Sequence, residues 1–210
     1  MGGQAVAPRS ARTEQPPEDP WWDYAHATAV AMASGREPPT AAIYGPLLHP
    51  GEVGRLHAPA EYSRFQRPDD TPTPGWHLRR SGDVLVTSHR IMASRPQGGW
   101  LAFWYQDLAE WHTDLPTRTL TMSFAEDQCA PVRLHGPAVP AIALWSAQAV
   151  FGAEWQNDPR LIALATPSPA AQHRREQERA AAAARQAWMK DNAARATARR
   201  APAPAIGIDR

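Results

Sequence analysis

The residues that could perform chemistry in this sequence are scattered along the chain. There are eight histidines and a single cysteine, Cys129. His89, His112 and His135 stand far apart, and the sequence contains neither a His-Glu-x-x-His pattern nor a Cys/His pairing at zinc spacing. A zinc site would therefore need ligands from distant strands, so we expect ordinary surface or turn histidines and predict no bound metal.

Two other arrangements could support catalysis, and their surroundings favour neither. Cys129 falls between acids and a proline, with no helix N-terminus or fixed cation in the sequence pattern to activate its thiol. Asp107, Glu110 and Asp114 could supply paired carboxylates, but at a strand end they are expected to face water. The phosphate-cradling patterns Gly-x-Gly-x-x-Gly and Gly-x-x-x-x-Gly-Lys do not occur. We predict a protein that is not an enzyme, holds no cofactor and takes no small-molecule substrate.

Arginine is the residue type that favours a binding function. Four arginines flank a loop rich in proline and aspartate: Arg64, Arg67, Arg79 and Arg80. Their guanidinium groups could meet an anionic headgroup or an acidic partner through paired hydrogen bonds. Two aspartates in the same loop offset part of this positive field, so a solvated charged loop is the alternative.

The C-terminal residues carry most of the positive charge. The whole chain has a net charge of +1, whereas residues 166–210 hold nine lysines and arginines against four acids. Candidate anion contacts there include Arg174, Arg175 and Arg179. Counterion release or surface potential would attract such a tail to nucleic acid or to an anionic membrane. A solvated helix is the alternative, because Glu176 and Glu178 interleave with the basic residues.

The strands that must position these residues are clearest at the centre of the chain. Two apolar runs flank Thr87-Ser-His-Arg90, and a glycine pair leads into an aromatic run over 100–105, which predicts a β-meander of strands about five or six residues long. The aromatic run is apolar on both faces, so it should be central or covered on its outer face. Residues 119–124 and 132–135 alternate as half-buried strands do. For residues 53–65 the sequence predicts an irregular extended run that is broken at Pro59. For residues 67–75 it predicts a loop.

Three helices are expected around these strands. Residues 21–34 are expected to form a short amphipathic helix with Gly35 as its C-cap. The aromatic face of this helix covers the body of the protein or docks on a partner. After Pro140 the apolar residues recur with helical spacing, which predicts a helix of about 15 residues that ends by the stop signal Asn157-Asp158-Pro159. Ser168 then opens a last helix that runs to about residue 199. This last helix has no apolar stripe, so we expect it to be exposed to solvent.

Composition suggests how the chain is divided. Proline is frequent, with 22 in 210 residues, and clusters outside the centre. We predict disorder over 1–20, a short helix and linker over 21–46, one domain over 47–165 and a basic helical tail over 166–210. A single cysteine excludes an intrachain disulfide, and no segment has the pattern of a signal peptide or a membrane span. These features predict a cytoplasmic protein, with the membrane periphery as an alternative location.

The order of these elements resembles a known family. A Pro50-Gly-Glu52 opening and an extended strand precede Gly82-Asp-Val-Leu-Val-Thr87-Ser-His-Arg90, a tryptophan-bearing strand, two hairpin strands and an amphipathic helix. Over about residues 47–155 this pattern resembles the bacterial pleckstrin-homology-like (PH-like) and GRAM-type domains. The resemblance implies an α+β, mainly β fold: a bent seven-stranded antiparallel sheet or partly open barrel with the helix plugging one end.

The resemblance also implies a function and a role for the Thr-x-x-Arg turn. The chain would be a non-enzymatic binding or scaffolding module that engages a protein partner or the membrane periphery, with nucleic-acid binding through the tail as the alternative. Thr87 can fix a turn by hydrogen bonding to the backbone two residues on, and Arg90 can brace nearby carbonyls or carboxylates. The sequence departs from the family at the long 67–75 loop, at the N-terminal helix, and in lacking the basic cluster that lipid-binding members carry in their first hairpin.

Overall fold

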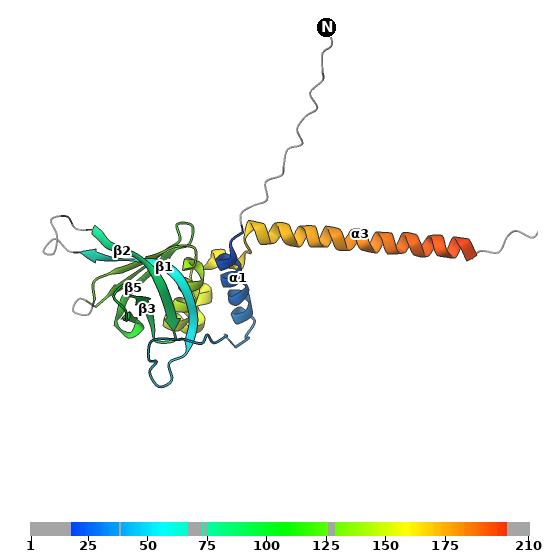
Figure 1. The fold of residues 1–210 in the computed structure, drawn as a ribbon. Coiled ribbons are helices and arrows are strands. Elements are labelled where there is room, and N and C mark those ends of the chain that lie inside the picture. The colour runs from blue at the N-terminus through cyan, green and yellow to red at the C-terminus, as the bar shows by residue number, and fades with distance from the viewer. Residues whose placement is uncertain (1–17, 38, 67–72, 74, 126–128, 201–210) are drawn as a thin grey trace, which may run out of the picture. The chain divides into compact units, whose positions relative to one another are not determined.

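The computed structural model describes residues 18–37, 39–66, 73, 75–125 and 129–200 (Figure 1). These residues belong to two compact units, one over Glu18–Ser168 and one that contains the C-terminal helix. Most of the predicted disordered N-terminus and most of the 67–75 loop lie outside the described residues. Within the part that is described, no helix is long and apolar enough to cross a membrane.

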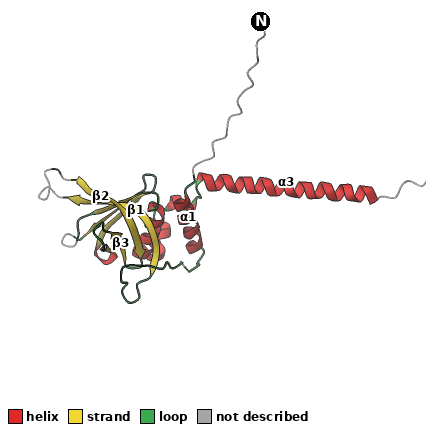
Figure 2. Cartoon of the chain, viewed as in Figure 1, coloured by secondary structure: helices red, strands yellow, loops and turns green. Residues whose placement is uncertain are grey.

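The unit over Glu18–Ser168 has an α+β fold in which one antiparallel sheet is combined with two helices and three short 3₁₀ helices (Figure 2). In chain order the elements are α1 (Pro20–Ala33), β1 (Gly54–Gln66), β2 (Gly75–Thr87), β3 (Arg90–Ser94), β4 (Trp100–Trp104), η1 (Tyr105–Asp107), β5 (Leu108–Asp114), β6 (Thr119–Phe124), β7 (Val132–His135), α2 (Val139–Phe151), η2 (Gly152–Asn157) and η3 (Ile162–Ala165).

The sheet has seven strands in the order β4-β3-β2-β1-β7-β6-β5. All its pairs are antiparallel, and in the described residues β4 and β5 each pair with one strand only, so the sheet is open. The predicted strands near 90–94, 100–105, 119–124 and 132–135 are confirmed. Gly98 and Gly99 both have positive φ angles, which suits the glycine pair to the tight β3–β4 turn.

The predicted break in the first strand was wrong, and the second strand is longer than predicted. β1 is a continuous strand of 13 residues and is not broken at Pro59. β7 pairs only with Glu61–Arg64 of β1, so at Pro59 the strand β1 pairs with β2 and has no strand on its other side. A sheet tolerates proline at such a position, because the missing N–H is not needed for pairing. β2 also has 13 residues, because the segment from Gly75 to Arg80 extends the predicted central strand. The result is a long β1–β2 hairpin (Figure 1).

The sequence interpretation did not assign β5. Burial alternates along β5: Glu110 is exposed, Trp111 is buried, His112 is exposed and Thr113 is buried. This alternation is the mark of a half-buried strand. The predicted solvent exposure is right for Glu110, while Asp107 and Asp114 are half-buried.

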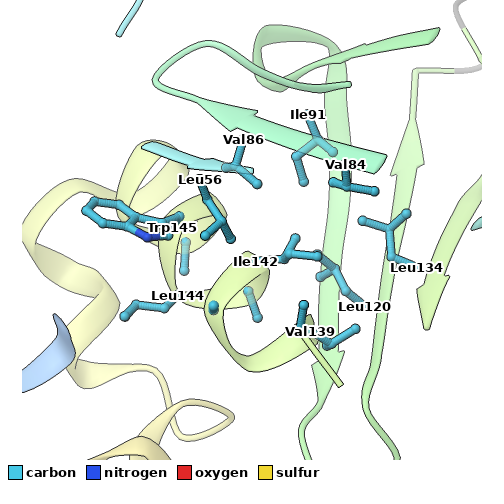
Figure 3. Close-up of a cluster of buried hydrophobic side chains, with 14 of the residues drawn as sticks. Leu56, Val84, Val86, Ile91, Leu120, Leu134, Val139, Ile142, Leu144 and Trp145 are labelled. Atoms are coloured by element: carbon cyan, nitrogen blue, oxygen red, sulfur yellow. The ribbon is translucent and has the colours of Figure 1, made fainter. Parts of the chain in front are cut away.

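The core lies between the sheet and α2. Figure 3 shows side chains from the strands, such as Val84 and Leu120, facing Ile142 and Trp145 of α2. α2 has 13 residues and ends at Phe151, earlier than predicted, because Gly152 follows with φ 57° and turns the chain into η2. Its buried small residues let the helix lie close to the strands.

α1 packs on the same unit, and its buried residues are Ala25, His26, Thr28, Ala29 and Met32. Trp22 Nε1 donates a hydrogen bond of 2.9 Å to the carbonyl of Thr166, and Trp145 Nε1 donates one of 3.3 Å to the Tyr24 hydroxyl. His26 Nδ1 lies 2.7 Å from the carbonyl oxygen of Leu164. These contacts join α1 to α2 and η3, as predicted for a helix that covers the body.

The two faces of β4 have different neighbours. Phe103 is buried in the core and stacks with Phe124 at 6.0 Å. Trp100 and Trp104 lie on the opposite face from Phe103, because alternate residues of a strand point to opposite faces. On that outer face His49 meets Trp104 edge-on at 5.0 Å, so the strand is covered by the segment before β1.

The second unit contains α3 (Pro169–Arg200), a helix of 32 residues that begins and ends within one residue of the predicted positions. Side chains over 175–190 are exposed, as expected from the absence of an apolar stripe.

Candidate functional site

The turn between β2 and β3 is built around the Thr87 hydroxyl. Its Oγ1 accepts hydrogen bonds from the backbone N–H groups of His89, at 3.1 Å, and Arg90, at 3.0 Å. The same hydroxyl donates to Glu52 Oε1 at 2.7 Å. Thr87 therefore fixes the turn as predicted and also connects it to the segment before β1.

Arg90 and Glu52 form a buried ion pair beneath this turn. Arg90 Nε lies 2.9 Å from Glu52 Oε1, and Nη2 lies 3.0 Å from Oε2, in a two-pronged arrangement. The exposed fractions of the two side chains are 9% and 0%. Arg90 Nη2 also donates to the Leu47 carbonyl at 2.8 Å, and its guanidinium lies 4.3 Å from the centroid of the Trp104 ring.

Electrostatics keep the Glu52 carboxylate charged in this environment. Burial alone would raise its pKa, but the hydrogen bonds from Arg90, the His49 N–H and Thr87, with the attraction of the Arg90 charge, lower the pKa overall. The pKa of Tyr105 is raised, first by burial and then by the negative charge of Glu52. Since every charge here is paired and covered, the cluster is a structural clamp that holds residues 47–52 against the sheet.

A hollow lined by arginine lies elsewhere, on the core-facing side of the sheet. Its volume is about 270 Å³, and its lining residues are Tyr62, Arg64, Arg80, Arg95, Gln97 and Leu101. We call it the arginine hollow. No carboxylate and no histidine belongs to this lining among the described residues.

The strand register explains which arginines reach the hollow. Tyr62 of β1 pairs directly with Arg80 of β2, so both side chains lie on the same face, and Arg64 lies on that face as well because it follows Tyr62 by two residues in the same strand. Arg79, one residue earlier, points to the other face and forms an ion pair of 2.5 Å with Glu61. Two adjacent arginines thus have different environments.

The third arginine comes from the β3–β4 turn. Arg95 closes that turn through hydrogen bonds of 3.0 Å, its N–H donating to Gly99 and its carbonyl accepting from Gly98. The sequence interpretation did not include Arg95 among the candidate residues. Its position just before Pro96-Gln-Gly-Gly was the available signal, because a basic residue at a hairpin turn can reach across to the neighbouring strands.

Arg64 makes a contact that the sequence did not predict. Its Nη2 donates to Cys129 Sγ at 3.7 Å, and its Nε is buried without a hydrogen-bond partner. The expectation that Cys129 has no fixed cation nearby was therefore wrong. This contact holds the Arg64 side chain at the edge of the arginine hollow.

The structure thus separates the predicted anion-contact residues. Arg64 and Arg80 meet at the hollow, Arg79 faces away from it, and Arg67 lies outside the described residues. The tail residues Arg174, Arg175 and Arg179 lie on α3, in the other unit. Nucleic-acid binding by that helix stays a prediction. Over the part of the chain that is described, no three His, Cys, Asp or Glu side chains are grouped closely enough to hold a metal ion.

Neither protein-family models nor curated proteins offer a guide to this site. No protein-family model matches the chain, and no curated protein matches it significantly. The functional argument therefore depends on the geometry of the arginine hollow.

Proposed function

We propose that the unit over Glu18–Ser168 is a non-enzymatic binding module of the PH-like type, whose arginine hollow takes an anionic group from its partner. The observation that carries this proposal is the convergence of Arg64, Arg80 and Arg95 around one hollow with no acid in its described lining. The anionic group is a phosphate or a carboxylate, since both fit the planar guanidinium fork.

The PH-like assignment is supported by the order and pairing of the elements. Seven antiparallel strands are followed directly by a helix that packs against the core, in the order that the sequence resemblance implies. The Thr87 and Arg90 contacts at the β2–β3 turn agree with the motif on which that resemblance was based. In this proposal the sheet is a partly open barrel and α2 plugs one end.

Charge repulsion favours ligand binding at the arginine hollow. Three guanidinium groups remain charged at any physiological pH and repel one another when no anion lies between them. A bound anion removes that repulsion and gains hydrogen bonds of about 1.5–3 kcal/mol each. At about 270 Å³ the hollow is slightly smaller than typical small-molecule pockets, which suits a compact headgroup or side chain.

The same lining argues for binding rather than catalysis. A hydrolytic or transfer reaction needs a nucleophile or a proton acceptor beside the bound group. The described lining offers arginine, glutamine, tyrosine and leucine, so the Tyr62 hydroxyl has no base among these residues to take its proton. Arginine cannot serve as the proton acceptor because it stays protonated.

Calorimetric titration with inorganic pyrophosphate tests the proposal, because this probe carries the anionic chemistry and nothing else. Arg80→Ala should weaken binding at least about tenfold, the equivalent of one charge-assisted hydrogen bond. Arg79→Ala is the matched control: it removes the same charge one residue away but from the opposite face, and should change affinity less than about threefold. Equal losses in the two variants, or no binding by the unmodified chain, would contradict the proposal.

A further inference from the structure

The second part of α3 carries a dense positive charge. From Arg179 to Arg200 the sequence holds six lysines and arginines against one acid, Asp191, which gives a net charge of +5. The other acids of the helix, Glu176 and Glu178, come before this stretch. α3 is continuous to Arg200, so this charge is spread along about 33 Å of helix (Figure 1). The positive field of α3 is therefore concentrated in one part of the helix.

A large aromatic side chain lies within this positive stretch. Trp188 is 66% exposed, and Met189 beside it is 54% exposed. Side chains are exposed at every position over 175–190, so no described residue of this unit covers the indole ring. The ring therefore adds no packing to the described part of the unit, and its flat faces are open to a ligand.

The cations near Trp188 keep their charge available for a partner. In the part of the chain that is described, Arg179, Arg185 and Lys190 form no ion pair with another residue. Arg185 precedes Trp188 by three residues, a spacing that places both on the same face of a helix. A negatively charged chain that meets Arg185 can therefore also reach the indole ring.

We propose that α3 binds single-stranded nucleic acid, with its phosphates held by Arg179, Arg185 and Lys190 and an unpaired base stacked on Trp188. The basic side chains displace counterions from the phosphates, which gives affinity without sequence preference. The indole ring can stack on any unpaired base. The bases of a duplex already stack on each other, so a duplex offers α3 mainly its phosphates. This inference does not depend on the arginine hollow, which belongs to the other unit.

The distribution of apolar residues favours a nucleic acid over an acidic protein or a membrane surface. A partner helix or a membrane interface would need an apolar stripe along α3 to bury. Over 175–190 the only large apolar side chains are Trp188 and Met189, which are adjacent and point about 100° apart around the helix. One aromatic ring among cations instead suits a ligand that has both phosphates and flat bases.

Fluorescence anisotropy of a labelled oligothymidylate of about 20 nucleotides, titrated with the full chain, tests the inference. Trp188→Ala should weaken binding at least about fivefold, the effect of losing one stacked base. Met189→Ala is the matched control, because it removes the neighbouring exposed side chain, which has no aromatic face. It should change the affinity less than about twofold. Alanine has the highest helix propensity, so neither variant should disturb α3.

A salt series tests the phosphate contacts. The logarithm of the affinity should fall linearly with the logarithm of the salt concentration, with a slope of about −0.7 for each phosphate contact on a single strand. Arg185→Gln should therefore make the slope shallower by about 0.7. Arg79→Gln removes one charge from the other unit, where Arg79 is 69% exposed, and should leave the slope unchanged.

Inorganic polyphosphate separates stacking from charge, because it carries phosphates without bases. The unmodified chain and Trp188→Ala should bind polyphosphate equally. The inference is wrong if the unmodified chain does not bind oligothymidylate, if Trp188→Ala and Met189→Ala lose the same affinity, or if Arg79→Gln changes the salt slope as much as Arg185→Gln does. A duplex bound as tightly as the single strand, with no effect of Trp188→Ala, would contradict it as well. Polyglutamate bound as tightly as oligothymidylate, with the same dependence on Trp188, would indicate an acidic protein partner instead.

Discussion

Replacing Arg90 by methionine would break the buried ion pair at the centre of the structural clamp. Methionine keeps most of the side-chain volume and removes the charge. The change deletes two hydrogen bonds to Glu52 and one to the Leu47 carbonyl, and it leaves the Glu52 carboxylate buried with only Thr87 and the His49 N–H as partners. An uncompensated buried charge is the costly element of this variant.

The expected loss is about 3–5 kcal/mol in the free energy of unfolding, the range for removing one partner of a buried pair. For a protein of this size each kcal/mol lowers Tm by about 2–4 °C, so Tm should fall by roughly 6–20 °C. The stacking of Arg90 on Trp104 at 4.3 Å adds to the loss. Since the side chain is 9% exposed, water can replace little of this interaction.

Urea unfolding followed by tryptophan fluorescence measures the loss directly. Arg79→Ala is the reference for an exposed pair, because Arg79 is 69% exposed and its bond to Glu61 should contribute less than about 1 kcal/mol. Adding Glu52→Gln to Arg90→Met should recover part of the stability, since it removes the stranded charge. A loss below about 1 kcal/mol for Arg90→Met, equal to that of the exposed pair, would refute the view that this clamp holds the fold.

Two further predictions concern the same region. The pKa of Glu52 is lowered in the folded protein, so the stability from its charged form is present above the pKa of the unfolded carboxyl, about 4.3, and is lost as pH falls through the folded value. The difference in unfolding free energy between the unmodified chain and Glu52→Gln should therefore shrink as pH drops below about 5, and a difference independent of pH would argue against a charged Glu52. Gly54→Ala should cost about 1–3 kcal/mol, because its Cβ would lie 2.3 Å from Ile43 Cγ1 and 2.4 Å from the Ala41 carbonyl oxygen. Gly75→Ala is the control, because the nearest atom to its added Cβ is 3.5 Å away, and it should cause no measurable loss of stability in thermal unfolding. Equal losses of stability in the two variants would exclude a close-approach role for Gly54.

Local sequence patterns were sufficient for elements whose signals lie within a few residues. Alternation predicted β6 and β7, a proline after a favoured N-cap predicted the start of α3, and aromatic spacing predicted α1. The Thr-x-x-Arg pattern predicted both the turn and a bracing arginine, because its first hydrogen bonds are local. These features depend on backbone propensities and short-range contacts, which the sequence contains directly.

Tertiary structure decided the features that depend on pairing between distant segments. Pro59 interrupts a strand pattern, yet β1 continues through it because β7 pairs only further along. Alternation alone indicates that Arg79 and Arg80 point to opposite faces, but only the pairing of Tyr62 with Arg80 shows which of them meets Arg64 and Arg95. Glu52 acquires its partner 38 residues away.

By itself, therefore, the sequence determined the strands and helices with strong periodicity and the types of side chain available for binding anions. The tertiary structure selected three arginines for one hollow, paired a fourth with Glu52 and left Tyr44 and Leu47 exposed. The physical reason is that charge and apolarity belong to residues, whereas convergence and burial arise only when the sheet register and helix packing bring remote residues together.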